Sequence, residues 1–503
     1  MNTNDYKNFY QNYEEMCAAY QLANSIIYFD KTTIAPKAGS AMRNKLTSIL
    51  DGESFSYMTD PKNLEKLEAM LELDDLDDIT KESVRQRLRL LRDIRIIPKA
   101  EYVAFQNLIA DSSVAWEEAK EKNDYAIFEP YLKKTIQALK KLLSYRAKEG
   151  TPYDMLLDDY EPGMNIKKYD EFFSKIKQEL LPFIQKIVKE GKPIDDSSMH
   201  QHFDAGKQAA FMEVVKKYLH FDADKCYMGV SVHPYTMKVG PGDTRLTTAY
   251  DEEFITSSIF SIIHEYGHAL YGMQVDAEYD NTHVLGENMS MGIHESQSRM
   301  LENYIGRNRS FWINNYPALQ VLFPNELGEV DLDSFMEQIN ISHPSLIRTD
   351  ADELTYPIHI LIRYELEKAI FNEDMPLDHL DQVWADKYEE YLGIRPSNPA
   401  EGILQDMHWG SGQIGYFPTY ALGSAYSAQF YHQMIKDLDV DTLLAQNHFE
   451  VIAQWLHDNI HKYGSYLPSE EILKRVTGES FNPQYYIDYL IQKYSNIYQI
   501  NER

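Results

Sequence analysis

A His-Glu-x-x-His motif lies at His264, Glu265 and His268, inside an apolar segment that spans residues 254–273. Residues four apart lie on the same face of a helix, so both imidazoles can bind one metal ion. Glu265 follows the first histidine directly and can act as a base toward water at that metal. This pattern of residue types is typical of a metallopeptidase.

The apolar flanks of the motif predict a buried helix. Ile259, Phe260, Ile263 and Leu270 recur at helical spacings around the two histidines. Buried imidazoles and a buried carboxylate are unfavourable unless they have polar partners. Because a metal ion supplies such a partner, burial favours a metal site over two histidines that merely pack in a core.

A second histidine pair, His457 and His461, has the same spacing and serves as an internal comparison. Polar residues surround this pair, Asp458 stands where the first motif has glutamate, and Lys462 follows. We therefore expect a solvent-exposed helix face here and no metal site.

Glu295 is the candidate for a third metal ligand. It lies 27 positions beyond His268, on a predicted helix that spans residues 291–304, which leaves room for a loop and a returning helix. Two histidines and one carboxylate leave the fourth position open for water, as catalytic zinc requires. The alternative is a surface carboxylate that pairs with Arg299, four residues further on. Glu302 is a candidate hydrogen-bond partner for the ligand histidines.

Charge and cysteine content exclude several classes of protein. The chain has 49 Lys and Arg against 78 Asp and Glu, a net charge of −29, and no basic cluster, so we expect neither nucleic acid nor an anionic membrane as a partner. Two cysteines far apart predict no disulfide framework and favour a reducing compartment. The polar amino terminus and the lack of a long apolar run predict a cytoplasmic protein that does not span a membrane.

Helical periodicity dominates the rest of the chain. The best candidate strands lie at residues 227–235 and 244–250, with a Gly-Pro-Gly turn at 240–242, and they lead into the metal motif. We therefore expect a small β-sheet beside the metal. No repeat or linker interrupts the pattern, which favours one mainly α-helical domain over residues 1–503, with two lobes around a cleft.

Five motifs occur in order along the chain, namely DxRxT at Asp243–Thr247, HExxH at His264–His268, HES-Gln at His294–Gln297, IRxxAD at Ile347–Asp352 and GxxQDxHW at Gly402–Trp409. Together they resemble the motifs of the thermostable carboxypeptidase family, whose members are zinc metallocarboxypeptidases of metallopeptidase family thirty-two. The resemblance covers essentially the whole chain.

The resemblance implies a mainly α-helical, saddle-like fold with a deep groove, and a homodimer. It also implies removal of single residues from peptide carboxyl termini with broad specificity. It gives His264, His268 and Glu295 as ligands of one zinc ion per chain, with cobalt as an alternative, and Glu265 as the base that activates the zinc-bound water. One departure lies near the amino terminus, where Phe29 stands in place of the tryptophan expected in relatives.

The family motifs also suggest residues that bind the substrate. An exopeptidase must hold a free carboxylate, for which a guanidinium group is well suited. Arg348 is the first candidate and Arg245 the second. The resemblance suggests His233 and Tyr420 near the developing oxyanion.

Two of these assignments have structural alternatives. Arg348 is followed by Asp350, Asp352 and Glu353, and its role can instead be a structural ion pair. His408, with its neighbours in the last motif, can shape the end of the groove or pack structurally.

Two other functions fit parts of the sequence. A helical zinc oligoendopeptidase shares the ligand set but does not need to capture a free carboxylate, so it would still cut peptides with an amidated carboxyl terminus. An acidic, non-catalytic binding protein with a relict metal site is the other alternative, and the intact Glu265 argues against it.

Overall fold

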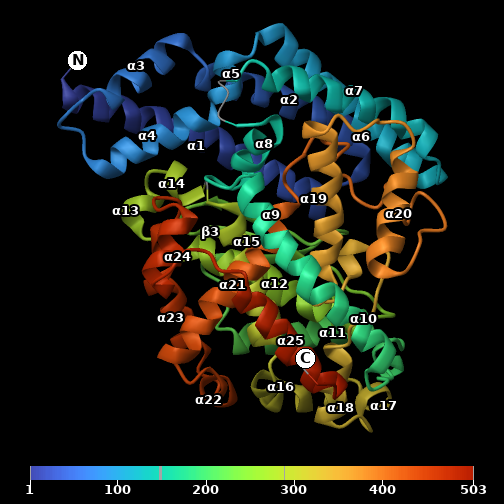
Figure 1. The fold of residues 1–503 in the computed structure, drawn as a ribbon. Coiled ribbons are helices and arrows are strands. Elements are labelled where there is room, and N and C mark those ends of the chain that lie inside the picture. The colour runs from blue at the N-terminus through green and yellow to red at the C-terminus, as the bar shows by residue number, and fades with distance from the viewer. Residues whose placement is uncertain (1, 147–149, 288, 502–503) are drawn as a thin grey trace. The chain divides into compact units, whose positions relative to one another are not determined.

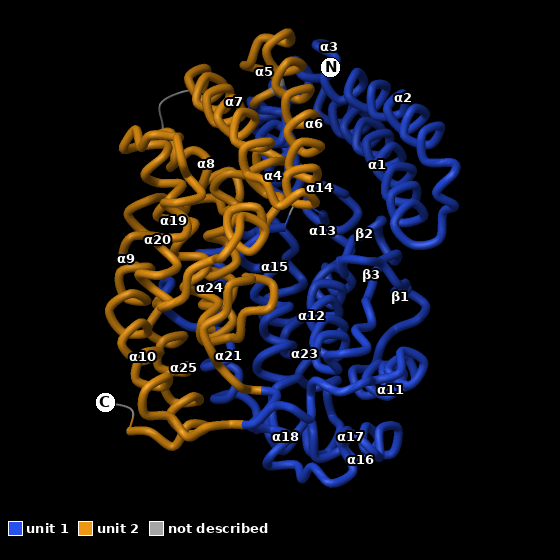
Figure 2. The backbone as a smooth tube through the Cα atoms, turned by 90° about the vertical axis from the view of Figure 1, so that its right-hand side faces the viewer, with its two compact units in different colours: residues 1–92, 195–339, 430–481 blue, residues 93–194, 340–429, 482–503 orange. Residues whose placement is uncertain are grey.

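The computed structural model describes residues 2–146, 150–287 and 289–501, and over these residues the chain is mainly helical with a small three-stranded sheet (Figure 1). This confirms the predicted fold class. The chain forms two compact units, each assembled from three segments (Figure 2). Unit 1 comprises Met1–Arg92, Asp195–Ile339 and Phe430–Phe481, and unit 2 comprises Asp93–Ile194, Asn340–Gln429 and Asn482–Arg503. The single domain stays a prediction.

Unit 1 contains the sheet and the helices around it. Its elements are α1 (Thr3–Thr33), η1 (Lys37–Gly39), α2 (Ser40–Met58), α3 (Pro61–Leu71), α4 (Asp78–Leu90), η3 (Ser197–Met199), α11 (Ala205–Tyr218), β1 (Cys226–Val230), β2 (Thr236–Gly240), β3 (Asp243–Thr248), α12 (Ile255–Met273), α13 (Ala277–Asp280), α14 (Val284–Glu287), α15 (Met291–Arg299), the π-helix η4 (Met300–Gly306), α16 (Arg309–Leu322), α17 (Pro324–Leu327), α18 (Leu332–Ile339), α22 (Val440–Ala445), α23 (Phe449–Asn459), η6 (His461–Tyr463) and α24 (Ser469–Thr477).

Among its described residues, unit 2 has helices joined by loops and no strand. Its elements are α6 (Lys99–Lys122), α7 (Tyr125–Leu143), α8 (Pro152–Tyr160), α9 (Ile166–Lys175), the π-helix η2 (Ile176–Leu180), α10 (Leu181–Glu190), η5 (Arg348–Asp350), α19 (Tyr356–Asn372), α20 (Leu380–Leu392) and α25 (Gln484–Tyr498). Two helices have their residues divided between the units, namely α5 (Arg92–Ile96) and α21 (Pro418–Asp437).

The sheet has the strand order β1-β3-β2. The antiparallel pair β2–β3 is a hairpin that turns at Gly242, whose φ of +77° favours glycine. Strand β1 pairs with β3 in the parallel direction. The two predicted strands correspond to β1 and β3, whereas β2 lies in a stretch that the alternation of residue types does not identify.

The amino-terminal helices of unit 1 pack around their own core. Helices α1, α3 and α4 lie together (Figure 1) and enclose Tyr13, Cys17, Leu67, Met70 and Val84, all of which are buried. Helical spacing places these apolar side chains on one face of each helix, which is why the three helices associate.

In unit 2, aromatic rings pack between helices α8, α9 and α19. Tyr364 stacks on Phe173, with ring centroids 4.7 Å apart, and tilts against Tyr153 and Tyr169. These tyrosines are fully or almost fully buried. The packing fixes α19, which also carries polar residues described below.

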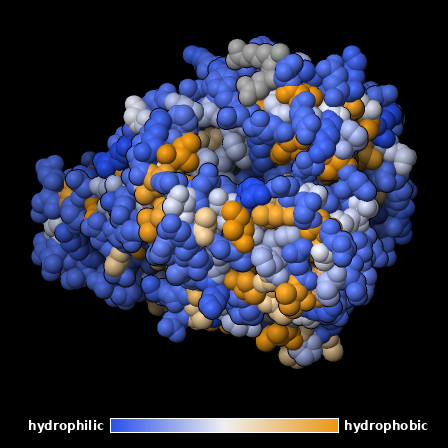
Figure 3. Space-filling model, turned by 90° about the horizontal axis from the view of Figure 1, so that it is seen from below, coloured by the Kyte–Doolittle hydropathy of each residue, from blue (hydrophilic) through white to orange (hydrophobic). Residues whose placement is uncertain are grey.

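The face of the molecule in Figure 3 is mainly hydrophilic, with separate apolar patches. This agrees with a chain in which acidic residues exceed basic ones by 29. Within the described part of the chain, no helix is both long and apolar enough to cross a membrane.

Candidate metal centre

Helix α12 carries the His-Glu-x-x-His motif and is buried on most sides. Ile259, Ile263 and Ala269 are at most 1% exposed, as the apolar flanks predict. The helix packs against strands β2 and β3, which lie beside it in Figure 2. The predicted small sheet therefore borders the motif helix.

Helix α15 approaches α12 very closely at Gly267. A Cβ atom at this position would lie 2.5 Å from the carbonyl oxygen of Gln297 and 2.6 Å from the Cα of Ser298. Only glycine permits this distance, because real Cβ atoms do not approach backbone so closely. The close approach brings Glu295 next to the histidines of α12.

The three predicted ligands lie together. The Nε2 atoms of His264 and His268 are 3.8 Å and 3.5 Å from Oε2 of Glu295, and one donor atom from each residue falls within 4.8 Å of the others. A tetrahedral zinc site with bonds of about 2.0–2.1 Å requires donor atoms roughly 3.3 Å apart. The donor set and its spacing therefore fit a zinc ion with two imidazoles and one carboxylate.

Glu302 orients the first histidine. Its Oε2 is 2.9 Å from Nδ1 of His264, which leaves the Nε2 lone pair directed toward the centre. Arg299 bridges the two carboxylates, because it donates to Oε1 of Glu295 at 2.7 Å and to Oε2 of Glu302 at 3.1 Å. Glu302 lies in the π-helix η4, a type of segment that often occurs at functional sites. The predicted contact of Glu302 with a histidine is thus present. Glu295 also pairs with Arg299, but its carboxylate is buried and does not lie on the surface.

His294 occupies the corresponding position beside the second histidine. Its Nδ1 is 2.7 Å from Nδ1 of His268, so one of the two nitrogens must carry the proton between them. Burial, followed by the nearby His268, lowers the pKa of His294 to about 3. A neutral His294 can accept the proton of His268 Nδ1, which leaves Nε2 of His268 free as a donor to a metal.

The titratable groups at the centre are tightly coupled. Burial opposes ionisation of Glu295 and Glu302, yet Arg299 and the histidines outweigh it and hold the pKa of both carboxyl groups low, to about 2 for Glu302. Burial opposes protonation of His264, but the two carboxylates raise its pKa. Protons therefore compete with a metal ion for His264 as the pH falls.

Glu265 points its carboxylate toward strand β2. The residue is 9% exposed, and the hydroxyl of Thr236 donates to its Oε2 at 2.6 Å. Sequence reasoning missed Thr236, because nothing in the spacing of residues 236 and 265 indicates that they meet.

Arg245 lies on the other face of the sheet from α12. In the β2–β3 register Arg245 is opposite Met237, so both side chains lie on the same face of the sheet. Successive residues of a strand point to opposite faces, and the side chain of Thr236, the residue before Met237, contacts α12. Its guanidinium pairs with Asp243 and lies over the ring of Phe29. His233 is exposed at the turn that leads into β2.

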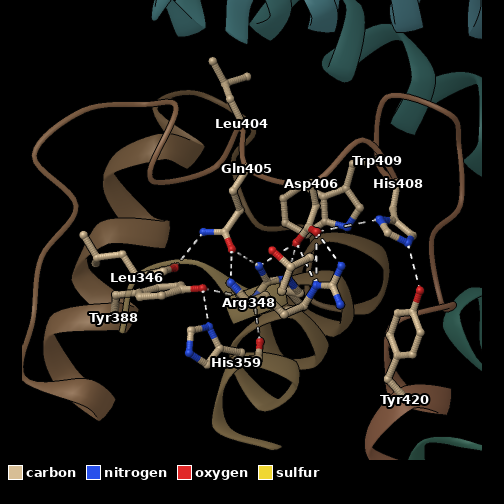
Figure 4. Close-up of polar contacts among 12 residues, drawn as sticks. Leu346, Arg348, His359, Tyr388, Leu404, Gln405, Asp406, His408, Trp409 and Tyr420 are labelled. Carbon is tan, nitrogen blue, oxygen red and sulfur yellow. Dashed lines mark hydrogen bonds and ion pairs between the residues drawn. The ribbon is translucent and has the colours of Figure 1, made fainter. Parts of the chain in front are cut away.

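Arg348 belongs to a buried cluster in unit 2 (Figure 4). Its Nε and Nη2 donate to Oδ1 of Asp406 at 3.1 Å and 2.8 Å, and its Nη1 donates to the hydroxyl of Tyr356 at 3.2 Å. The ion-pair partner is therefore Asp406, 58 positions away, and not one of the acidic residues that follow Arg348 in sequence. The side chain is 9% exposed.

Arg363 shares the same carboxylate, and sequence reasoning missed it. It is fully buried, donates to Oδ2 of Asp406 at 2.6 Å and to Oε1 of Gln405 at 2.8 Å, and stands over the ring of Trp384. Burial opposes ionisation of Asp406, but the two arginines keep its pKa far below the usual range. Two guanidinium groups thus contact the one carboxylate of Asp406.

His408 and Tyr420 lie together beside this cluster (Figure 4). The Tyr420 hydroxyl is 3.4 Å from Nε2 of His408, and the ring of Tyr420 lies 5.1 Å from the Arg348 guanidinium. Burial lowers the pKa of His408 to about 4, so this imidazole is neutral near pH 7. Three of the five predicted substrate residues, namely Arg348, His408 and Tyr420, therefore form one group.

The prediction for His461 is wrong. This histidine is completely buried, with Nδ1 2.6 Å from Oε1 of Gln274 and Nε2 2.8 Å from Oε1 of Gln297. Helix α23 ends at Asn459, so His457 and His461 do not share one helical face. The polar residues next to His461 in sequence suggested exposure to solvent, but the tertiary fold buries its side chain.

Comparison with known proteins identifies relatives over nearly the whole chain. The model of the family described as "Carboxypeptidase Taq (M32) metallopeptidase" matches residues 9–494. Carboxypeptidase 1 of Bacillus subtilis is 40% identical over 481 residues, which cover 95% of this chain and 96% of that protein. Thermostable carboxypeptidase 1 of Thermus thermophilus is 35% identical, over 93% and 94% of the two chains. The solved Pyrococcus furiosus carboxypeptidase superimposes with a TM-score of 0.94 at 34% identity, over 98% and 99% of the two chains.

Proposed function

The chain belongs to the carboxypeptidase Taq (M32) metallopeptidase family, and on that premise we propose that it removes single residues from peptide carboxyl termini at a zinc site, with Glu265 as the base. Membership of the family makes it a metallocarboxypeptidase. The metal, the breadth of its specificity and the roles of individual residues are parts of the proposal.

One observation supports the catalytic site above all. Nδ1 of His264 contacts Glu302, and Nδ1 of His268 contacts His294. The Nε2 atoms of both histidines lie near the same oxygen of Glu295. Such outer partners fix the ring orientation and tautomer of metal-binding histidines. Histidines that only pack in a core do not require three donor atoms to converge in this way.

The chemistry divides between the metal and the protein. A bound zinc ion supplies Lewis acidity, which lowers the pKa of water and polarises a carbonyl group. Glu265 accepts a proton from the attacking water and passes it to the leaving amine. His233 and Tyr420 are the proposed donors to the oxyanion that develops on the scissile carbonyl.

Recognition of the terminal carboxylate is proposed for Arg348, with Arg245 as the second candidate. Asp406 neutralises only one of the two guanidinium groups that contact it, those of Arg348 and Arg363. Arg348 is buried, and a guanidinium in such an environment attracts an anion more strongly than in water. Arg245 has its own carboxylate, Asp243, and is less suited to the role.

The test compares one peptide with a free and with an amidated carboxyl terminus, incubated with the zinc-loaded protein and followed by mass spectrometry. We expect stepwise loss of terminal residues from the free peptide only. In parallel, Glu265→Gln should retain bound zinc and lower kcat by several orders of magnitude, because the amide cannot accept the proton. Retained turnover in this variant would remove Glu265 from the mechanism.

Internal cuts in both peptides would instead indicate the zinc oligoendopeptidase and leave Arg348 with a structural role. Absence of zinc from the purified protein would favour the non-catalytic binding protein. Cobalt is the alternative metal, and reconstitution of the metal-free protein with each ion in turn compares the two.

The proposal also includes a homodimer and a cytoplasmic location. The homodimer follows from the resemblance to the family, and sedimentation measures it directly. A cytoplasmic location is supported by Cys17 and Cys226, which are both buried and unpaired.

A further inference from the structure

We propose that Thr236 is a positioning residue for Glu265, and that its hydroxyl group holds the carboxylate in the orientation in which it works as a base. This inference rests on the proposed function, in which Glu265 is that base. It concerns a residue of strand β2 that lies outside all five sequence motifs.

The contact is short and directional. Oγ1 of Thr236 is 2.6 Å from Oε2 of Glu265 and 2.9 Å from the backbone carbonyl oxygen of the same residue. A hydroxyl group has one hydrogen, so it donates to one of these oxygens at a time. An ionised carboxylate is the stronger acceptor, and 2.6 Å is a typical length for a hydrogen bond from a hydroxyl to a charged oxygen.

The strand holds Thr236 rigidly at this place. The preceding residue, Tyr235, donates its N–H to Oγ1 of Thr247 at 3.1 Å, and its carbonyl oxygen accepts from the N–H of Thr247 at 2.9 Å. Thr236 itself is opposite Leu246 in the β2–β3 ladder. The last residue of the DxRxT motif therefore anchors the segment that carries the Thr236 hydroxyl.

Glu265 depends on this contact for its orientation. Among the residues that the structure describes, no other hydrogen bond reaches its carboxylate. A glutamate side chain has three rotatable bonds, and it loses rotational freedom when a base must point in one direction. A fixed donor on one oxygen leaves the other oxygen available to accept a proton from water.

A purely structural role is the alternative, in which the hydroxyl only ties β2 to the backbone of α12. The two roles differ in their kinetic consequences. A positioning role affects kcat through Glu265, whereas a structural role affects folding or metal binding and does not depend on which side chain residue 265 carries.

The experiment uses the zinc-loaded protein and a peptide with a free carboxyl terminus. Thr236→Val should lower kcat by about ten- to a hundredfold, as expected for the loss of one charge-assisted hydrogen bond, and leave KM and bound zinc unchanged. Thr236→Ser keeps the hydroxyl and should restore most of the rate. Thr47→Val is the matched control, because among the described residues the hydroxyl of Thr47 bonds only the backbone oxygen of Arg43.

A double variant separates this inference from the proposed function. In the Glu265→Gln background, Thr236→Val should change the residual rate less than about twofold, because Thr236 acts through the carboxylate. If Glu265→Gln is inactive but Thr236→Val has the kcat of the natural chain, the role of Thr236 is refuted and the base assignment stands. If Glu265→Gln retains turnover, the base assignment itself fails.

Protein stability is checked at the same time. If valine disrupts the sheet, seen as lost zinc and an altered circular dichroism spectrum, Thr236→Ala and Thr236→Ser replace it. Alanine must then lower kcat with zinc retained, and serine must restore it. Equal rates in these two variants would refute the inference.

Discussion

Replacing Gly267 by alanine should weaken metal binding although the residue binds no metal. The new Cβ would lie 2.5 Å from the carbonyl oxygen of Gln297, and the nearest atoms are all backbone atoms that no rotamer change can move. Helix α15 must therefore shift away from α12. Because Glu295 is on α15 and both histidines are on α12, the shift separates the predicted ligands.

The size of the shift follows from the contact. An ordinary van der Waals distance begins near 3.4 Å, so the helices must separate by about 0.9 Å at this point. The distances of 3.8 Å and 3.5 Å from Glu295 Oε2 to the histidine nitrogens then exceed about 4 Å, whereas tetrahedral zinc needs roughly 3.3 Å. We expect a loss of about ten- to a hundredfold in zinc affinity and about 1–3 kcal/mol in the free energy of unfolding.

Zinc affinity is measured by competition with a chromophoric chelator, and stability by thermal unfolding of the metal-free protein. Gly272→Ala is the matched control in the same helix. Its nearest neighbour would be Cδ of Lys238 at 3.6 Å, so the methyl group fits without displacement. This control should bind zinc normally and be as stable as the natural chain or slightly more stable, because alanine favours the helix.

Natural zinc affinity and stability in Gly267→Ala would refute the reasoning, since the helices would then have accommodated the methyl group without moving Glu295. Equal losses in both variants would also contradict it. That result would point to a general intolerance of side chains along α12.

Two further predictions concern buried carboxylates. Glu302→Gln should lower zinc affinity about ten- to a hundredfold with the fold retained, because His264 loses a charged acceptor; chelator competition tests this, and unchanged affinity would contradict it. Glu367 is buried, and burial raises its pKa to about 7 despite hydrogen bonds from Trp409, Tyr153 and the backbone of Gly415. Its contribution to stability is thus present below about pH 4.5 and lost as the pH rises through about 7, by up to about 3 kcal/mol. The stability of the natural chain relative to Glu367→Gln, measured by denaturant unfolding between pH 4.5 and 8, should fall with rising pH, and a rise would refute the sign.

The local patterns of the sequence were sufficient to single out the candidate metal ligands that the structure brings together. His264, Glu265 and His268 are placed by helical spacing alone, and the apolar flanks predicted the burial of α12. Glu295 was found because a carboxylate on a returning helix completes a zinc ligand set. These inferences need only the periodicity of a helix and the chemistry of metal ligands.

The hydrogen-bond and ion-pair partners of buried polar residues could not be predicted from the sequence patterns. Arg348 was the first candidate for the substrate carboxylate, and the alternative was an ion pair with the acidic residues that follow it. The ion pair is instead with Asp406, a carboxylate that Arg348 shares with Arg363. His461 was expected in solvent and is enclosed next to Gln297. Hydrogen bonds between residues tens of positions apart leave no periodic signal, because periodicity reports only which face of its own element a side chain occupies.

By itself, the sequence determined the helical class, the metal-binding motif and the resemblance to a family, since each is encoded in residue types at short, fixed spacings. Only the tertiary structure decided that Thr236 meets Glu265, that Gly267 sets the distance between α12 and α15, and which nitrogen of each histidine faces the centre. These features depend on strand register and on the packing distance between helices. Both are set by the whole core and not by the residues at the contact.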